Sequence, residues 1–327
     1  MKRRILWLAV ACGTVLGAGT GAAWADGLPV LSIDAGPTGV TTSAGDARYI
    51  TLPAGGNTVV ARVRTDGGQV LVSRLVRGAF TIPAVAYDGT AGGLSGDGKT
   101  LVLINPRASF PRARTPLVVL DAKTLRRRAD VKLRGDFSYD AVSPNGRWLY
   151  LIQYNAPRDP TKYLVRAYDL RAGRLVAKPI TDPHERGEKM RGSPVTRAAS
   201  ADRRWAYTLY DGAGKVPFIH ALDTSTRSAR CIDLDGIAAR DVSRLRLNEA
   251  ANTITVTGPG GAVGAVDTRT FKLTAITPAE SSDTARSTPG EGFPWGLVIG
   301  ATAGVLALGA GLALVLLRRR QRLVPVQ

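Results

Sequence analysis

A short polar turn recurs along this chain at intervals of about fifty residues, and an apolar strand follows it each time. The turn is clearest at Ser95–Lys99 (SGDGK) and at Ser143–Arg147 (SPNGR). Asp, Asn and Gly tolerate the backbone angles of such turns, and an Asp or Asn side chain bonds nearby backbone N–H groups. The segments that follow, 101–104 and 148–152, are rich in apolar and β-branched residues, which favours β-strands.

Five such units occupy residues 39–278. The other turns are at 43–48 and 200–204 and, in a looser form, at 248–252. In four of the units a later strand ends in aspartate, at Asp121, Asp169, Asp223 and Asp267. A period near fifty residues with four strands in each unit is typical of propeller blades. We therefore predict an all-β fold, a β-propeller of about five four-stranded blades. We interpret the four aspartates as structural, because Asp at a tight turn accepts backbone N–H bonds.

Two of these elements carry a resemblance to a known family. The run SPNGRWLY at Ser143–Tyr150 and the Leu-Asp-x-x-Thr end of the third strand resemble repeats of the secreted YVTN/YncE-like, TolB-like and WD-repeat-like β-propellers, over about residues 30–278. The resemblance implies a fold but no single activity, because such repeats serve many unrelated roles. Propellers of this kind often have six or seven blades, which remains the alternative to five. We expect a strand at Leu28–Asp34 to join the last blade and close the ring.

Residues 1–25 have the three parts of a signal peptide. Lys2-Arg3-Arg4 is the charged start, an apolar segment follows, and Ala23-Trp24-Ala25 fits the small-x-small cleavage rule. Cleavage there makes Asp26 the first residue of the mature chain. A lipoprotein signal ending at Cys12 and an uncleaved anchor are the two alternatives.

The other end of the chain predicts a membrane anchor. Residues 278–294 are a Pro/Ser/Thr-rich linker, and Trp295–Leu317 contains 23 uncharged residues, enough to span a bilayer. The tail 318–327 begins with Arg-Arg-Arg-Gln-Arg, and such basic residues favour the cytoplasmic side. We therefore predict a single-pass protein of the cell membrane, with the propeller (26–277) extracellular and the C-terminus cytoplasmic.

The charge of the external part is positive. Without three Lys/Arg of the signal and four of the tail, the remaining 37 Lys/Arg exceed the 26 Asp/Glu by 11. Outside the membrane the abundant anions are lipid head groups, wall polymers and acidic proteins rather than nucleic acid. The expected partner is therefore a protein or an anionic envelope component, bound with an affinity that falls as salt rises.

The long loops indicate where such a partner would bind. In a propeller the connections between second and third strands share one face with the connections between blades. Here these are the longer ones, at 105–115, 155–162 and 211–217 within blades and at 78–88 and 178–193 between blades. Long loops on a rigid scaffold commonly carry binding residues. The candidate ligand- or partner-binding residues are Arg107, Arg112, Arg114, Arg158, Lys162, His184, Arg186, Lys189 and Arg191.

The sequence offers little for catalysis. His184 and His220 are its two histidines, and no nucleophile elbow, phosphate loop or metal-ligand spacing occurs. We predict no catalytic residue, no metal and no cofactor. Asp88 and Asp140 each follow a tyrosine just before an inner strand, and we expect them to face the central channel. The favoured hypothesis is a binding module; a hydrolase or lactonase-like enzyme with a site at the channel, and a purely structural spacer, are the alternatives.

Overall fold

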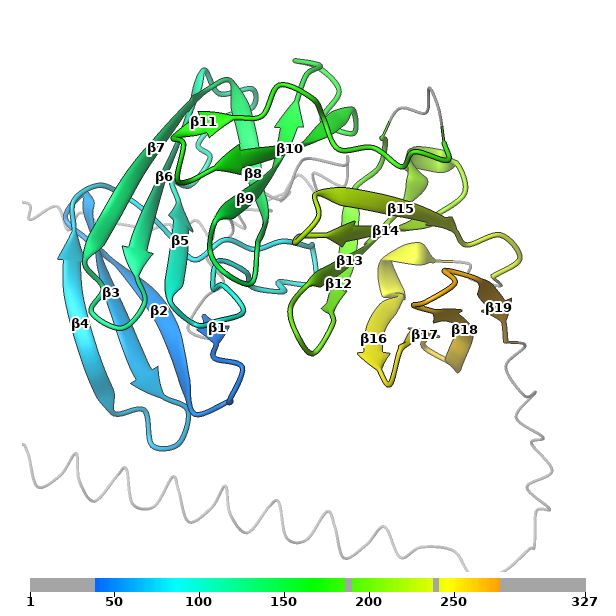
Figure 1. Cartoon of the computed structure of the whole chain (residues 1–327), viewed down its shortest axis with the longest axis horizontal. Coiled ribbons are helices and arrows are strands. Elements are labelled where there is room, and N and C mark those ends of the chain that lie inside the picture. Colours follow the sequence, from blue (N-terminus) through cyan, green and yellow to red (C-terminus); the bar gives the residue numbers. More distant parts are fainter. Residues whose placement is uncertain (1–38, 186–189, 238–240, 277–327) are drawn as a thin grey trace, which may run out of the picture. The chain divides into compact units, whose positions relative to one another are not determined.

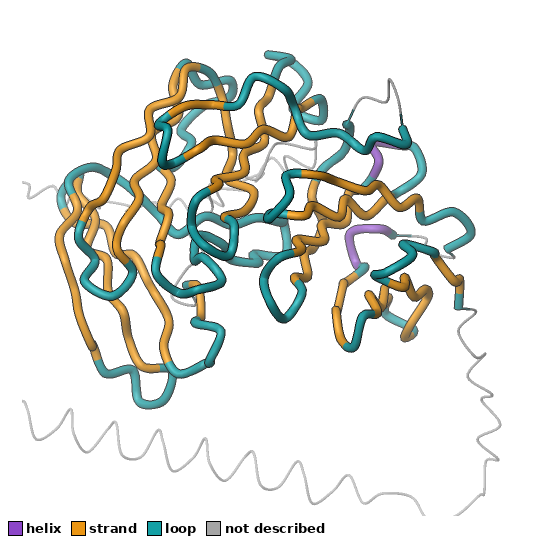
Figure 2. The backbone as a smooth tube through the Cα atoms, viewed as in Figure 1, coloured by secondary structure: helices purple, strands orange, loops and turns teal. Residues whose placement is uncertain are grey.

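The computed structural model describes residues 39–185, 190–237 and 241–276. Strands make up almost all of its regular structure, beside two single turns of 3-10 helix at Gly212–Gly214 (η2) and Val242–Arg244 (η3) (Figure 2). No helix in these ranges is long and apolar enough to cross a membrane. The predicted signal peptide, linker, membrane span and tail all lie outside the described residues.

The strands form five antiparallel sheets, and within each sheet every strand pairs with its neighbour in the chain (Figure 1). The first sheet contains β1 (Val40–Thr41), β2 (Ala47–Ala54), β3 (Asn57–Arg64) and β4 (Val70–Val76). The second contains β5 (Thr100–Ile104), β6 (Arg114–Asp121) and β7 (Arg127–Arg134). The third contains β8 (Asp136–Val142), β9 (Trp148–Tyr154), β10 (Tyr163–Asp169) and β11 (Arg174–Leu175). The fourth contains β12 (Pro194–Ala199), β13 (Trp205–Tyr210), β14 (Phe218–Asp223) and β15 (Ser228–Asp233). The fifth contains β16 (Arg246–Ala250), β17 (Thr253–Gly258), β18 (Gly261–Asp267) and β19 (Leu273–Ala275).

In the recurring turn, the serine hydroxyl forms the hydrogen bonds that connect the turn to the next strand. Ser143 Oγ bonds to Asn145 Oδ1 at 2.8 Å and accepts the backbone N–H of Trp148 at 2.9 Å, which starts the next strand in register. The same two bonds recur at Ser95, Asp97 and Thr100, and at Ser200, Asp202 and Trp205. The predicted turns at these three places and the strands after them are therefore confirmed, and the described residues form one sheet for each of the five predicted units.

The aspartates that end the third strands are structural, as predicted. Asp223 Oδ1 accepts the backbone N–H groups of Ser225 at 2.9 Å and Thr226 at 3.2 Å. Burial opposes its ionisation, but these bonds and the Arg204 guanidinium outweigh burial, and the pKa of Asp223 is lowered. Equivalent turn bonds form at Asp121, Asp169 and Asp267.

The second sheet departs from the prediction of four strands in every unit. Ala91–Ser95, the segment that would supply the inner strand of this unit, forms only isolated bridges, Ala84 with Ala91 and Leu94 with Leu101. Gly93 has a φ of +104°, and a backbone in that region cannot continue a regular strand. The sheet therefore keeps three regular strands and a loose inner edge.

Each sheet packs on the next through a cluster of buried apolar side chains. Tyr49 of the first sheet shares a cluster with Leu101 of the second, and Tyr207 of the fourth shares one with Ile254 of the fifth. Two further clusters join the second sheet to the third and the third to the fourth. Within the described ranges no cluster joins the fifth sheet to the first, and the strand expected at Leu28–Asp34 lies outside them.

One segment, 81–93, links sheets that are not neighbours. The backbone N–H of Tyr87 donates to the Pro194 carbonyl at 3.0 Å, and that of Asp88 donates to Val195 at 3.3 Å. Pro194 and Val195 begin β12, so this segment ties the second sheet to the fourth, past the third.

Candidate functional site

The elaborated connections lie together at one end of the strands, as predicted. They join β5 to β6, β9 to β10, β13 to β14 and β11 to β12. The backbone N–H of Gly192 donates to the Thr161 carbonyl at 3.1 Å, and that of Ser193 donates to Asp211 Oδ1 at 2.7 Å. We call this end the loop face, and the opposite end, with the short Ser-Asp turns, the turn face.

Arg107 fixes the first loop from inside. Its guanidinium donates to both carboxylate oxygens of Asp136 at 2.5 to 3.2 Å, and neither side chain is more than 2% exposed. Arg112 adds its backbone N–H to Asp136 Oδ2 at 2.9 Å and a guanidinium bond to the Phe137 carbonyl at 2.6 Å. Burial, aided by the charge of Arg107, lowers the pKa of Arg112 to about 10. Both arginines therefore hold the loop. The sequence had predicted that their charges would lie on a binding surface.

Other predicted basic residues do lie at the surface. Arg114 and Arg158 are exposed. Lys162 Nζ lies 2.9 Å from Asp159 Oδ2, and the Arg191 guanidinium lies 3.5 Å from the same oxygen. Bonds from Thr161 and Lys162 lower the pKa of Asp159 to about 2. Two cations thus share one carboxylate, which leaves a net positive charge there. Arg186 and Lys189 lie outside the described residues.

A pocket of about 380 Å³ opens on the loop face between segment 81–93, the fourth sheet and the start of the fifth. Its lining residues are Tyr87, Asp88, Ser193, Val195, Asp211, Ser243 and Arg246. Asp211 is oriented by N–H bonds from Ser193 at 2.7 Å and Ala213 at 3.0 Å. Two carboxylates, a guanidinium and three hydroxyl groups give the pocket a hydrogen-bonding lining.

Hollows also lie on the turn face, one of them of about 700 Å³ between the first and second sheets. Others of about 340 and 520 Å³ lie between the second and third and between the fourth and fifth. Each lies between two neighbouring sheets, so we attribute them to the spacing of the sheets. The pocket on the loop face differs, since its lining combines segment 81–93 of the second sheet with residues of the fourth and fifth sheets, which are not neighbours of the second.

The two predicted channel carboxylates have different surroundings. Asp88 lines the loop-face pocket and accepts bonds from Thr90 N at 2.9 Å and Thr90 Oγ1 at 2.6 Å. Asp140 in β8 is 2% exposed and is bound by the guanidinium of Arg197 in β12, which also donates to the Asp140 carbonyl. Neither Asp140 nor His184 lines this pocket. Asp88, Asp140 and His184 therefore do not converge in this pocket.

His220 in β14 lies near the buried Asp140–Arg197 pair. Its side chain is 2% exposed, and its Nε2 has no hydrogen-bond partner among the described residues. Burial lowers the pKa of His220 to about 4, although the Asp140 charge opposes this. The imidazole is therefore neutral at physiological pH.

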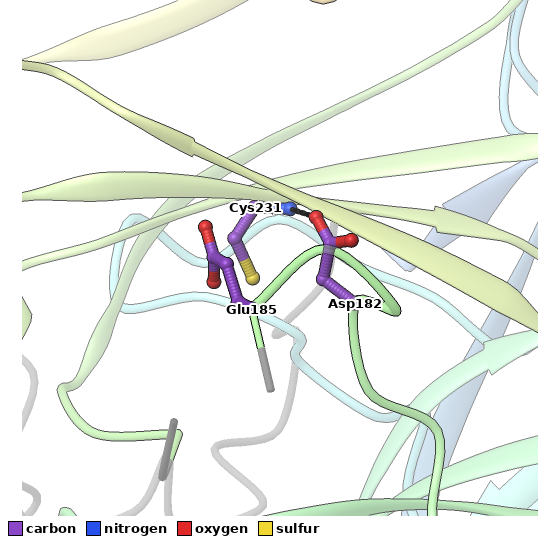
Figure 3. Close-up of side chains that lie close together, drawn as sticks. All are labelled: Asp182, Glu185 and Cys231. Atoms are coloured by element: carbon purple, nitrogen blue, oxygen red, sulfur yellow. Dashed lines mark hydrogen bonds between the residues drawn. The ribbon is translucent and has the colours of Figure 1, made fainter. Parts of the chain in front are cut away.

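The side chains of Asp182, Glu185 and Cys231 lie close together (Figure 3), with one ligand atom of each within 4.8 Å of the others. Both Asp182 oxygens already accept backbone N–H groups, from His184 at 2.8 Å and from Cys231 at 2.8 Å. Burial opposes ionisation of Asp182, yet these bonds outweigh it and the pKa is lowered. The Arg230 guanidinium lies 3.8 Å from Asp182 Oδ2, so a cation of the protein already accompanies this carboxylate. We interpret the cluster as a fastening between this loop and β15.

Several pocket residues were not predicted as binding residues, including Ser193, Asp211 and Arg246. Ser193 and Asp211 fall within the loops 178–193 and 211–217, which the sequence did place on this face. Nothing local marks Arg197 as the partner of Asp140, because the two residues are 57 positions apart and meet only when the third and fourth sheets pack.

No protein-family model matches the chain, and no curated protein matches it. Solved structures similar to it include TolB from Acinetobacter baumannii, at 11% identity and a TM-score of 0.39, covering 71% of this chain and 52% of TolB. The β-propeller domain of Cps50 (Swd1) from Myceliophteria thermophila matches at 13% identity and a TM-score of 0.40, covering 75% and 67%. Prolyl oligopeptidase B from Galerina marginata matches at 13% and 0.47, covering 73% and 33%. The chain thus spans about half of TolB and a third of the peptidase.

Proposed function

We propose that this protein is a membrane-anchored, extracytoplasmic binding module that receives an acidic protein or an anionic envelope polymer on its loop face. The observation that carries the proposal is that the loop arginines have two different roles. Arg107 and Arg112 form buried or half-buried bonds that hold the first loop. Arg114, Arg158, Lys162 and Arg191 have their charged groups at the surface. A rigid loop set with outward cations loses little conformational entropy on binding an anionic partner.

The loop-face pocket adds specificity to this surface. Asp88 and Asp211 are carboxylates, so the pocket itself repels an anion and suits an uncharged or cationic group of the partner. A partner that places acidic groups on the outer cations and a hydrogen-bonding group in the pocket fits both features.

The test uses the full-length chain in detergent micelles. Binding of poly-glutamate and of a poly(glycerol phosphate) polymer is measured from low to high salt. The test variant changes three exposed loop-face cations to serine: Arg114, Arg158 and Lys162. The matched control removes three exposed turn-face cations: Lys99, Lys123 and Arg171.

We expect the loop-face variant to lose affinity and to show a shallower dependence on salt, while the control variant keeps both. Preference for one polymer would identify the class of partner. Equal losses in the two variants would mean that overall charge alone attracts the polymers, and the proposed site would then be wrong.

A further inference from the structure

The first sheet exposes an apolar face. Cross-strand pairing places Leu52, Val59 and Leu75 in one row, and Val63 and Val70 in another. Leu52 is 52% exposed, Val70 57% and Leu75 59%. We call this surface the free face; its apolar residues are Ile50, Leu52, Val59, Ala61, Val63, Val70 and Leu75, beside the polar Arg48 and Ser73. Ala61 and Val63 are buried, whereas Leu52, Val70 and Leu75 are exposed. Three large apolar side chains exposed on one face of a sheet mark a surface that binds something.

The opposite face of the same sheet is covered. Tyr49, Val60 and Val76 belong to the cluster that packs on the second sheet. Side chains alternate along a strand, so the first sheet has two faces. One face packs on the second sheet; the other, the free face, belongs to no cluster of buried side chains among the described residues.

The fifth sheet is a poor match for the free face. Its outward row runs through Asn248, Thr255, Ala265 and Thr274, as the pairing of β16 to β19 shows. Packing that row on leucine and valine would bury amide and hydroxyl groups without partners. The fifth sheet also has its own fourth strand, β19, in the place where a closing strand would pair.

The chain enters the first sheet beside the free face. Gly39 has a φ of +59°, and a Cβ there would lie 1.9 Å from the Tyr49 carbonyl oxygen and 3.0 Å from Ile50 Cγ2. Ile50 is a residue of the free face. Leu28–Ile33, with the sequence LPVLSI, precedes Gly39 by five residues. At about 3.3 Å per residue those five can cover about 17 Å, more than the roughly 10 Å from β2 to β4.

We propose that Leu28–Ile33 folds back over the free face of the first sheet and covers it as an intramolecular cap. The segment is short, apolar and adjoins the surface. A second copy of the chain would bring two domains of strongly positive charge together, which disfavours that occupant. The cap would protect the end of the row of sheets, as polar terminal repeats do in linear repeat proteins.

The test uses cysteine pairs in the full-length chain with Cys231→Ser as background. Leu31→Cys is combined with Leu52→Cys, with Leu75→Cys or, as the comparison, with Thr274→Cys on the fifth sheet. After mild oxidation, we expect an intramolecular disulfide with position 52 or 75 and none with position 274. A bond to position 274, a disulfide-linked dimer through position 75, or no bond in any pair would overturn the proposal.

A second measurement does not depend on oxidation. If the free face is covered, Leu75→Asp buries a charge and lowers the melting temperature, whereas Thr274→Asp, at an exposed position of the fifth sheet, serves as the control. Leu75→Asp with the melting temperature of the control would contradict the cap.

Discussion

Arg107 and Asp136 form an ion pair, 29 residues apart in sequence, in which neither side chain is more than 2% exposed. The pair ties the longest loop within a sheet, between β5 and β6, to the start of β8. Removing one partner of a buried pair leaves an uncompensated charge, which costs far more than the pair itself contributes.

We therefore expect Arg107→Ala to lower the free energy of unfolding by about 3–5 kcal/mol. Arg114→Ala, at an exposed position on the next strand, should change it by less than about 0.5 kcal/mol. Chemical denaturation of the full-length chain, followed by tryptophan fluorescence, compares the two. Equal stability of the two variants would mean that Asp136 does not need its arginine.

His220 predicts a pH dependence. Burial lowers its pKa from 6.5 to about 4, so the unfolded chain binds a proton below pH 6.5 while the folded chain binds it only near pH 4. The free energy of unfolding should therefore fall as pH decreases across this window, by up to about 3 kcal/mol from this residue. His220→Gln should flatten the profile between pH 6.5 and 4. An unchanged slope in that variant would assign the dependence to other groups.

Gly92 lies in a place too tightly packed for a larger residue. It has an ordinary backbone, but a Cβ there would lie 2.7 Å from Tyr139 Cε1 and 2.8 Å from Val85 Cγ1. Gly92→Ala should therefore destabilise the fold by about 1–3 kcal/mol. Gly260→Ala is the control, because a Cβ at Gly260 meets nothing within 4 Å. Thermal unfolding of both variants checks this, and a neutral Gly92→Ala would show that segment 81–93 is loosely packed.

The predicted termini can be tested directly. We expect mass spectrometry of the purified chain to find Asp26 as its first residue, because Ala23-Trp24-Ala25 fits signal peptidase cleavage. Protease added to intact cells should remove the domain and leave a membrane fragment that contains Trp295–Leu317. A lipid on Cys12 or an intact Met1 would identify one of the two alternative anchors instead.

The repeating sheets could be predicted because their chemistry is local. Ser143 and Asn145 bond within their own turn, and Asp223 bonds the two residues after it, so the pattern is visible in any five-residue window. Alternation of apolar residues then assigned the strands. The weakened inner strand at Ala91–Ser95 was missed because the repeat implies a fourth strand in every unit, while Gly93 takes the backbone out of the strand conformation.

The binding surface was harder to predict because burial is not local. Arg107 and Arg158 are both loop arginines, yet one meets Asp136 in the interior and the other stays in solvent. Asp88 and Asp140 have the same preceding tyrosine, but packing of the third sheet on the fourth gives Asp140 an arginine. Such differences arise only when distant strands come together.

The bonds from Tyr87 and Asp88 to the start of β12 affect how this domain comes apart. In a chain of units that touch only their neighbours, melting can begin at either end and proceed one unit at a time. Here a link skips over the third sheet, so the central three sheets should melt in a single cooperative step. The outermost two sheets are then free to fray earlier, and hydrogen exchange should divide the domain into those two classes.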